Sequence, residues 1–299
     1  MAQDRPAAPT SAPPAPGATP PSREAAFFDL DKTVIATSSS TAFSRPFLAA
    51  GLLTRRAALR SVYAQLRYLL GPADERQTER LRAQLSRTIA GWDVSRVRAI
   101  VADTLHEAID PMVYAEAVAL MQGHREAGRD VVLVSASASE IVEPIAAVLG
   151  ADAVVATRMA VADGRYTGRI ELYVYGEYKA VAIRALADER GYDLSRCYAY
   201  SDSVTDLPML QAVGHGFVVN PDRALRRVAV EHGWGVLTFV RPAPLFPVPH
   251  ADRRLATAAG GAALAAVAGV ALRHLARRGR TARPRTGRRG RAARRRDVP

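Results

Sequence analysis

Three short apolar runs, far apart in the chain, each lead into polar side chains. The runs and the residues that follow them are 25–28 (Asp29 and Asp31), 131–134 (Ser135) and 197–200 (Asp202 and Asp206). Uninterrupted apolar runs of this length are typical of strands that are buried on both faces of a parallel sheet. Segments with apolar residues at helical spacing lie between them. Strands that alternate with helices predict an α/β fold with helices on both faces of the sheet.

The polar residues that follow these runs are expected to converge. Parallel strands end at the same edge of a sheet, and ligands bind beyond that edge. The stretch between the first and second runs is almost entirely helical in pattern and is too long for a simple crossover. We therefore expect a Rossmann-like parallel sheet core, formed by residues 24–43 and 113–245, with an inserted helical cap formed by residues 44–112.

Two further strand signals follow the second run. Residues 153–157 indicate a separate strand, and residues 159–174 indicate a hairpin. The pair Asp163-Gly164 stands at the centre of that second stretch, and Asp-Gly pairs favour tight hairpin turns.

Two positions have the pattern of a helix start. Ser137 and Glu140 have the spacing of a capping box, which predicts that a helix begins directly after the second apolar run. Asn220 is a candidate cap for a later helix, because Pro221 behind it suits a first helical position.

The charge of the chain is concentrated at its C-terminal end. The formal net charge is +12, and residues 273–299 hold twelve arginines and one acidic residue, so the rest of the chain is close to neutral. This Arg-rich tail is predicted to be disordered and contains no aromatic residue for stacking on bases. The high net charge therefore gives no reason to expect a specific nucleic acid as a partner.

The N-terminal residues 1–23 are rich in Pro and Ala, with seven prolines, and they contain no apolar run of the kind found in a signal peptide. We expect a disordered leader and no export, which places the catalytic part in the cytoplasm. The chain has a single cysteine, Cys197, and this fits a reducing compartment.

Residues 255–272 form an uncharged run of 18 residues composed mostly of Ala and Gly. A run of this length is at the lower limit for a segment that spans a bilayer of roughly 30 Å. A single span would carry the twelve arginines outward, against the positive-inside rule. We therefore favour an association with an anionic membrane surface at the inner face of the cell membrane, with a transmembrane segment as the alternative.

Carboxylates at two strand ends suit phosphoryl transfer. Asp29 and Asp31 could supply a nucleophile for phosphorus and a general acid that protonates the leaving oxygen. Asp202 and Asp206 could complete an oxygen site for Mg²⁺, which would offset the charge of the carboxylates and the phosphate. A DxD pair alone is common in surface turns, so the prediction depends on the order of all these elements along the chain.

Lysine is scarce in this chain. Only Lys32 and Lys179 are lysines among the 41 basic residues. An ammonium group is not interchangeable with a guanidinium at every site, so each lysine is a candidate functional residue. Lys179 could balance a nucleophilic carboxylate, and Ser135 with the helix amides behind it could hold phosphate oxygens.

These residues together resemble the motifs of the haloacid dehalogenase-like superfamily, in the branch that includes phosphoserine phosphatase (subfamily IB). The resemblance covers roughly residues 24–240. The matching segments, in order, are residues 28–34 (FDLDKTV), residues 134–137 (VSAS), Lys179 and residues 200–206 (YSDSVTD).

The resemblance implies a role for each matching residue. Asp29 would be the nucleophile and a ligand of Mg²⁺, and Asp31 would be the general acid and base, with its backbone carbonyl on the metal. The other implied roles are metal binding for Asp202, support of the metal's water shell or of Lys179 for Asp206, and binding of the substrate phosphate for Ser135, Ala136 and Lys179.

The sequence departs from the family pattern at three positions. Ser201 stands where the fourth motif usually begins with Gly, and Thr205 stands where Asn is usual. Phosphoserine phosphatases typically carry Glu nine residues after the nucleophile, where this chain has Ser38. A hydroxyl group is a weak partner for the ammonium group of phosphoserine, which argues against that substrate.

The sequence thus predicts a Mg²⁺-dependent phosphomonoester phosphatase that acts through an aspartyl-phosphate intermediate. The expected substrate is a small polar or lipid-linked phosphate. The alternative is a non-catalytic regulatory protein that binds a phosphorylated ligand or partner. Against that alternative, Asp29, Asp31, Lys179 and Asp202 are all present.

Overall fold

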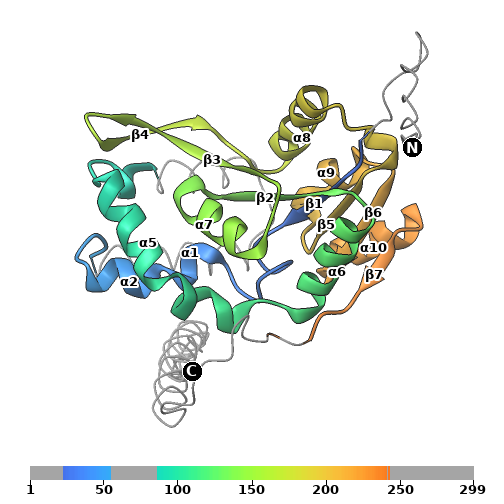
Figure 1. Cartoon of the computed structure of the whole chain (residues 1–299), viewed down its shortest axis with the longest axis horizontal. Coiled ribbons are helices and arrows are strands. Elements are labelled where there is room, and N and C mark those ends of the chain that lie inside the picture. Colours follow the sequence, from blue (N-terminus) through green and yellow to red (C-terminus); the bar gives the residue numbers. More distant parts are fainter. Residues whose placement is uncertain (1–22, 55–85, 241, 243–299) are drawn as a thin grey trace, which may run out of the picture. The chain divides into compact units, whose positions relative to one another are not determined.

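A seven-stranded sheet forms the centre of the protein, in the order β4-β3-β2-β1-β5-β6-β7 (Figure 1). The computed structural model describes residues 23–54, 86–240 and 242. All neighbouring strands are parallel except the pair β3 and β4. The strands are β1 (Ala25–Asp29), β2 (Asp130–Ala138), β3 (Ala153–Ala162), β4 (Arg165–Leu172), β5 (Tyr198–Ser201), β6 (His215–Val219) and β7 (Gly235–Leu237).

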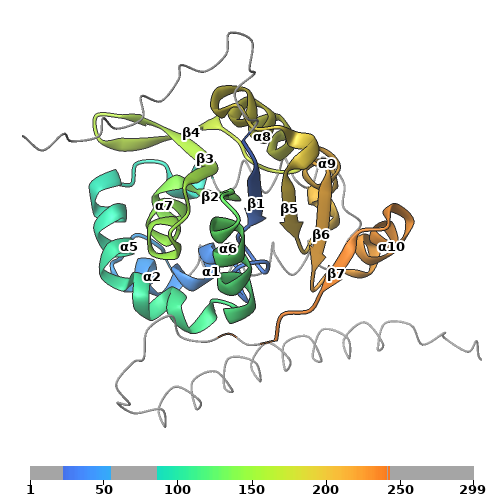
Figure 2. The same cartoon turned by 45° about the vertical axis from the view of Figure 1, so that its right-hand side comes forward.

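Helices cover both faces of the sheet (Figures 1 and 2). The α-helices are α1 (Ser39–Ala42), α2 (Ser44–Ala49), α5 (Val94–Ile109), α6 (Ala115–Glu126), α7 (Ser139–Leu149), α8 (Glu177–Arg190), α9 (Leu207–Gln211) and α10 (Arg223–His232). Short 3₁₀ helices are η1 (Asp110–Met112), η2 (Leu194–Arg196) and η3 (Val204–Asp206).

Successive residues of β1 point to opposite faces of the sheet and so enter different cores. Ala26 and Phe28 belong to the core shared with α5, α6 and α7, whereas Ala25 and Phe27 belong to the core shared with α8, α9 and α10. All residues of β1 are buried, as expected for a strand with helices on both faces. The predicted α/β fold with a Rossmann-like parallel sheet is therefore confirmed.

Strand β3 differs from the sequence prediction. The stretch 153–157 and the first arm of the hairpin, which were predicted as separate elements, form one strand. Its first half pairs in parallel with β2, and its second half pairs antiparallel with β4. The predicted hairpin turn lies at Asp163 and Gly164, both with positive φ (50° and 73°). Two positive φ values suit the twist of a two-residue hairpin turn.

The two predicted helix caps are both corrected. Helix α7 follows Ala138, which makes no side-chain cap, and Ser137 does not cap the helix. Helix α10 is capped by Asp222, whose Oδ1 accepts a hydrogen bond from the backbone of Leu225 at 2.7 Å. Asn220 instead adopts a positive φ of 43° and exchanges two hydrogen bonds with the backbone of Phe239.

Several predicted segments lie outside the described residues. These are residues 1–22 of the leader, residues 55–85 of the proposed cap, the apolar run 255–272 and the tail 273–299. The division into core (24–43 and 113–245) and cap (44–112) therefore stays a prediction. Within the ranges that are described, no helix has both the length and the apolar character needed to cross a bilayer.

A buried histidine packs against the central strands. His124 lies edge-on to Phe28, and its Nε2 lies 2.8 Å from the hydroxyl oxygen of Tyr200. The rings of Phe28 and Tyr200 stack with centroids 4.4 Å apart. Burial, and the nearby positive charge of Arg129, lower the pKa of His124 to about 4. The imidazole is therefore neutral in the folded protein at neutral pH.

The lowered pKa of His124 predicts that the folded protein loses stability in mild acid. The folded protein resists protonation of His124 down to about pH 4, against 6.5 for an ordinary histidine, so the unfolded state binds more protons between these values. We expect the free energy of unfolding to fall by about 1–2 kcal/mol from pH 7.5 to pH 5, after allowance for solvent screening. Urea unfolding at both pH values measures the change.

The matched control for this prediction is His124→Gln, which keeps a polar group beside Tyr200 but does not titrate. The variant should be less stable at pH 7.5 and should lose less stability than the native chain on acidification. Equal losses in the two proteins would show that other groups cause the acid sensitivity.

Candidate active site

A buried ion pair stands at the carboxyl end of β1. Asp29 is the last residue of that strand, and Lys179 lies in the first turn of α8. The Nζ atom of Lys179 lies 2.6 Å from Oδ1 of Asp29 and 2.7 Å from Oδ2 of Asp206. These three residues are at most 5% exposed. The structure therefore brings together one of the two lysines and two of the predicted aspartates, although they are far apart in the sequence.

Ser201 gives a physical role to one departure from the family pattern. It is fully buried at the end of β5, and its Oγ donates a hydrogen bond to Oδ2 of Asp206 at 2.7 Å. Glycine at this position would lack that donor. The same carboxylate oxygen thus accepts from both Lys179 and Ser201.

Thr33 connects the first and fourth motifs. Its buried Oγ1 lies 3.1 Å from Oδ2 of Asp29 and 3.5 Å from Oδ1 of Asp202. The turn that carries it begins at Leu30, whose carbonyl oxygen accepts hydrogen bonds from Val34 and Ile35. This turn places the threonine between two carboxylates that come from different strands.

Asp31 lies beyond the end of β1 and is partly exposed. Its Oδ1 accepts a hydrogen bond from the backbone of Ser39 at 2.7 Å, and its Oδ2 accepts one from Oγ of Ser137 at 3.1 Å. Ser135 is fully buried, and its Oγ accepts from the backbone of Ser137. Ala136 lies between these two serines and is partly buried.

Sequence reasoning missed four residues with hydroxyl groups at this site. Thr33, Ser39, Ser137 and Ser201 each contact a predicted site residue. Thr33, Ser137 and Ser201 lie inside the matching segments 28–34, 134–137 and 200–206, so their positions offered a signal. The contact of Ser39 with Asp31 depends on how α1 enters the site, which no spacing in the sequence shows.

Negative charge exceeds positive charge among the residues of the site. The carboxylates are those of Asp29, Asp31, Asp202 and Asp206, and the ammonium groups are those of Lys32 and Lys179. Burial, with repulsion from the other three carboxylates, raises the pKa of Asp29 well above its usual range, although Lys179 acts in the opposite direction. Burial is also the main cause that raises the pKa of Asp202 to about 6, while Lys32 opposes the shift.

The donor set fits a hard divalent cation. Asp29 and Asp202 approach the same hydroxyl group, and the four carboxylates of the site outnumber its two ammonium groups, an excess of negative charge that a cation would relieve. Oxygen ligands are those that Mg²⁺ takes. Over the described parts of the chain, no three side chains of His, Cys, Asp or Glu form a metal cluster.

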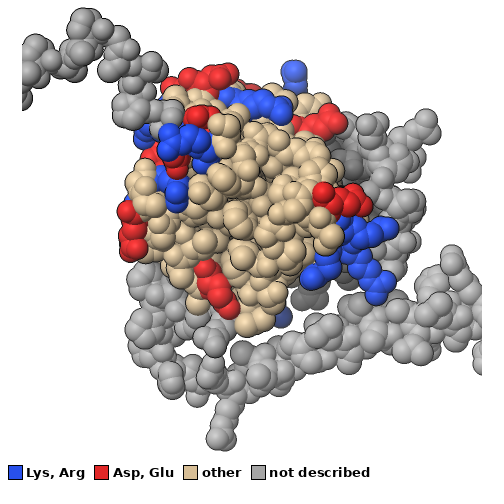
Figure 3. All heavy atoms as spheres, turned by 90° about the vertical axis from the view of Figure 1, so that its right-hand side faces the viewer, with Lys and Arg blue, Asp and Glu red and all other residues tan. Residues whose placement is uncertain are grey.

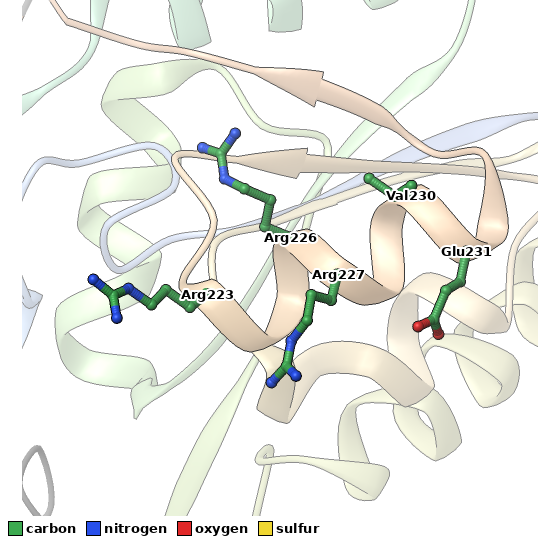
Figure 4. A pocket seen from close by; sticks show the side chains of 5 residues that line it. All are labelled: Arg223, Arg226, Arg227, Val230 and Glu231. Atoms are coloured by element: carbon green, nitrogen blue, oxygen red, sulfur yellow. The ribbon is translucent and has the colours of Figure 1, made fainter.

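A different surface feature lies along α10. An open hollow there is lined by Arg223, Arg226, Arg227, Val230 and Glu231 (Figure 4). None of the predicted site residues belongs to it. The face shown in Figure 3 carries its charged side chains mainly at the margins, and the coloured atoms on that face form no continuous basic surface.

Comparisons with known proteins identify the family of this chain. Residues 26–211 match the model of the haloacid dehalogenase-like hydrolase family, a range that contains every predicted site residue. A probable phosphatase of Mycobacterium tuberculosis is 57% identical over 268 residues, which cover 88% of this chain and 93% of the relative. A protein of Streptomyces azureus named for the inhibition of morphological differentiation is 58% identical, over 83% of this chain and 92% of the relative.

A solved structure shares the fold. A substrate-bound phosphoserine phosphatase superposes with a TM-score of 0.54 at 18% identity, covering 74% of this chain and 94% of that one. At that identity the likeness concerns the fold alone, and it agrees with the α/β architecture described above. Because the family model covers more than half of the chain and one relative is 57% identical, the chain belongs to the haloacid dehalogenase-like hydrolases and is a hydrolase.

Proposed function

We propose that this hydrolase is a Mg²⁺-dependent phosphatase that cleaves phosphomonoesters through a phosphoryl group carried on Asp29. The observation that carries the proposal is the buried carboxylate of Asp29 at a strand end, with Lys179 at 2.6 Å. A second carboxyl group, that of Asp31, is held two residues further along the chain. This pair supplies a nucleophile and a proton donor from one short segment.

In the first step, a carboxylate oxygen of Asp29 attacks phosphorus and forms an acyl phosphate. The bond between phosphorus and the ester oxygen breaks with its electrons on that oxygen. The carboxyl group of Asp31 donates its proton to the leaving oxygen, so that an alcohol departs instead of an alkoxide. Asp31 is left ionised at the end of this step.

In the second step, the ionised Asp31 takes a proton from a water molecule. The resulting hydroxide oxygen attacks phosphorus, and the bond between phosphorus and Asp29 breaks. Inorganic phosphate is released, Asp29 regains its carboxylate, and Asp31 is protonated for the next cycle. The two aspartates thus return to their starting states without a further reactant.

Asp29, Asp202 and the carbonyl oxygen of Asp31 would hold Mg²⁺, which supplies electrostatic stabilisation of the charge on the carboxylates and the phosphoryl oxygens. Asp206 is proposed to support this site, because one of its oxygens already contacts Lys179 and Ser201. The charge excess described above is what supports a divalent cation here.

Ser135, the backbone at Ala136 and Lys179 are proposed to bind the phosphate oxygens of the substrate. Ser135 follows the position on β2 that pairs with Asp29, so its hydroxyl lies on the strand next to the nucleophile. Lys179 already contacts Asp29 and could reach a phosphoryl group attached there. Hydrogen bonds to an ionised phosphate are stronger than those between neutral groups.

The proposed substrate is a small polar or lipid-linked phosphomonoester. Ser38, which replaces the glutamate typical of phosphoserine phosphatases, lies 2.8 Å from the hydroxyl of Ser40 and carries no charge for a substrate ammonium. A panel of soluble and lipid phosphates decides between the two substrate groups. A preference for lipid phosphates would favour a role of the apolar run 255–272 in binding a membrane surface.

The nucleophile is tested by Asp29→Asn. The amide cannot form the acyl phosphate, so we expect release of inorganic phosphate to fall at least about 10³-fold, since covalent catalysis would be lost. Malachite-green detection of phosphate over the substrate panel measures this. The control is Asp188→Asn on the exposed side of α8, which should leave the rate unchanged. Substantial activity in folded Asp29→Asn would place the nucleophile elsewhere.

The ammonium group is tested by Lys179→Arg. The variant keeps the charge, but both carboxylates contact the same Nζ atom. The larger, planar guanidinium does not fit between them in that geometry. We expect kcat/KM to fall at least about 10²-fold, the loss typical for one electrostatic contact at a reacting centre. Arg184→Lys, the reverse change on the exposed face of the same helix, is the control. A near-normal rate in Lys179→Arg would make the lysine a bystander.

The cation is tested by its removal. After treatment with EDTA we expect no turnover, and added Mg²⁺ should restore it. The ion should also raise the melting temperature, because a ligand present at about 100 times its Kd stabilises the native state by about 2.7 kcal/mol. Asp202→Asn should lose most of this thermal shift. Equal activity and melting temperature with EDTA and with Mg²⁺ would contradict a metal-dependent mechanism.

A further inference from the structure

Both oxygens of the Asp31 side chain are occupied by donors from other segments. The backbone of Ser39, the first residue of α1, donates to Oδ1 at 2.7 Å. The hydroxyl group of Ser137 donates to Oδ2 at 3.1 Å. Two hydrogen bonds to different oxygens fix the orientation of a carboxyl group better than one, because rotation would break both.

The two serines also contact each other. Oγ of Ser39 donates to Oγ of Ser137 at 2.7 Å, and Ser39 is fully buried. The hydroxyl proton of Ser137 is therefore directed toward Asp31, because the other side of its oxygen accepts from Ser39. The three residues form a chain of hydrogen bonds that ends at Asp31.

An irregularity in β2 gives Ser137 its position. Ser135 pairs with Ala156 of β3 and Ala138 pairs with Thr157, so residues 136 and 137 have no partner of their own on β3. Bulges of this kind redirect a side chain and are frequent next to active sites. The serine that the sequence predicted as a helix cap thus leaves the regular ladder and contacts Asp31 instead.

We propose that Ser137 and Ser39 are positioning residues that hold the Asp31 carboxyl group where it can pass its proton to the leaving oxygen. This inference rests on the proposed phosphatase function and adds to it two residues outside the set of predicted site residues. A hydroxyl group holds the carboxyl group without adding charge to a site that is already crowded with charges. The backbone N–H of Ser39 and the hydroxyl group of Ser137 contact Asp31 directly, whereas the side chain of Ser39 acts through Ser137.

The test separates orientation of the acid from a general loss of structure by changing the leaving group. p-Nitrophenolate leaves without a proton, whereas the alkoxide of glycerol phosphate needs one. The values of kcat/KM for the two substrates report the steps up to release of the leaving alcohol. The ratio of the two values therefore measures the contribution of Asp31 as an acid. The variant Asp31→Asn gives the ratio when that contribution is lost completely.

We expect Ser137→Ala to lower kcat/KM for glycerol phosphate by about 10-fold or more, within the range of general acid catalysis. The value for p-nitrophenyl phosphate should change by less than about 3-fold, since that reaction needs no proton donor. Ser137→Thr, which keeps the hydroxyl group, should restore most of the ratio. The control is Ser95→Ala, which removes an exposed hydroxyl in the first turn of α5 that donates to Asp93 at 2.6 Å.

The double variant Ser39→Ala/Ser137→Ala tests whether the Ser39 side chain acts on Asp31 through Ser137. Ser39→Ala should shift the ratio in the same direction by a smaller factor, and it should have no further effect when Ser137 is already alanine. An unchanged ratio in Ser137→Ala, or equal losses for both substrates, overturns the inference while the phosphatase proposal stands. If neither the native chain nor Asp29→Asn releases phosphate from either substrate, the proposed function fails and the inference fails with it.

Discussion

The contact between Lys179 and the carboxylates of Asp29 and Asp206 is the constraint on which the site depends. Burial of three charged groups is unfavourable unless each is paired with good geometry, and removal of one partner from such a group is strongly destabilising. The burial of Lys179 opposes its charge, but the two carboxylates outweigh this effect and raise its pKa. The end of β1, the start of α8 and η3 must therefore all be in place for the site to exist.

Hydroxyl groups complete this arrangement around the carboxylates. Thr33 lies between Asp29 and Asp202, Ser201 contacts Asp206, and Ser137 contacts Asp31. Each satisfies a carboxylate oxygen without a further charge, so the site keeps its excess of negative charge for a cation. The departure at Ser201 is consistent with the family chemistry, because it adds a donor and removes no carboxylate.

The sequence was sufficient to predict a parallel sheet with helices on both faces and the convergence of the motif residues at one edge of it. Apolar runs followed by polar residues are local features, and parallel pairing brings their ends to one edge regardless of their separation in the chain. It was not sufficient where local patterns compete with tertiary contacts. Ser137 has the spacing of a helix cap but contacts Asp31, and Asn220 contacts Phe239 while Asp222 caps α10. The partners of Ser137 and Asn220 lie 106 and 19 residues away in the sequence, so no local pattern identifies them.

The central claim is that a phosphoryl group is carried on Asp29, and a direct test is to trap it. The native chain would be mixed with substrate and Mg²⁺, quenched in acid within one turnover, digested and analysed by mass spectrometry. The account predicts an added phosphoryl group, labile to base, on the peptide that contains Asp29. Turnover without this label, or a label on a peptide that lacks Asp29, would contradict it.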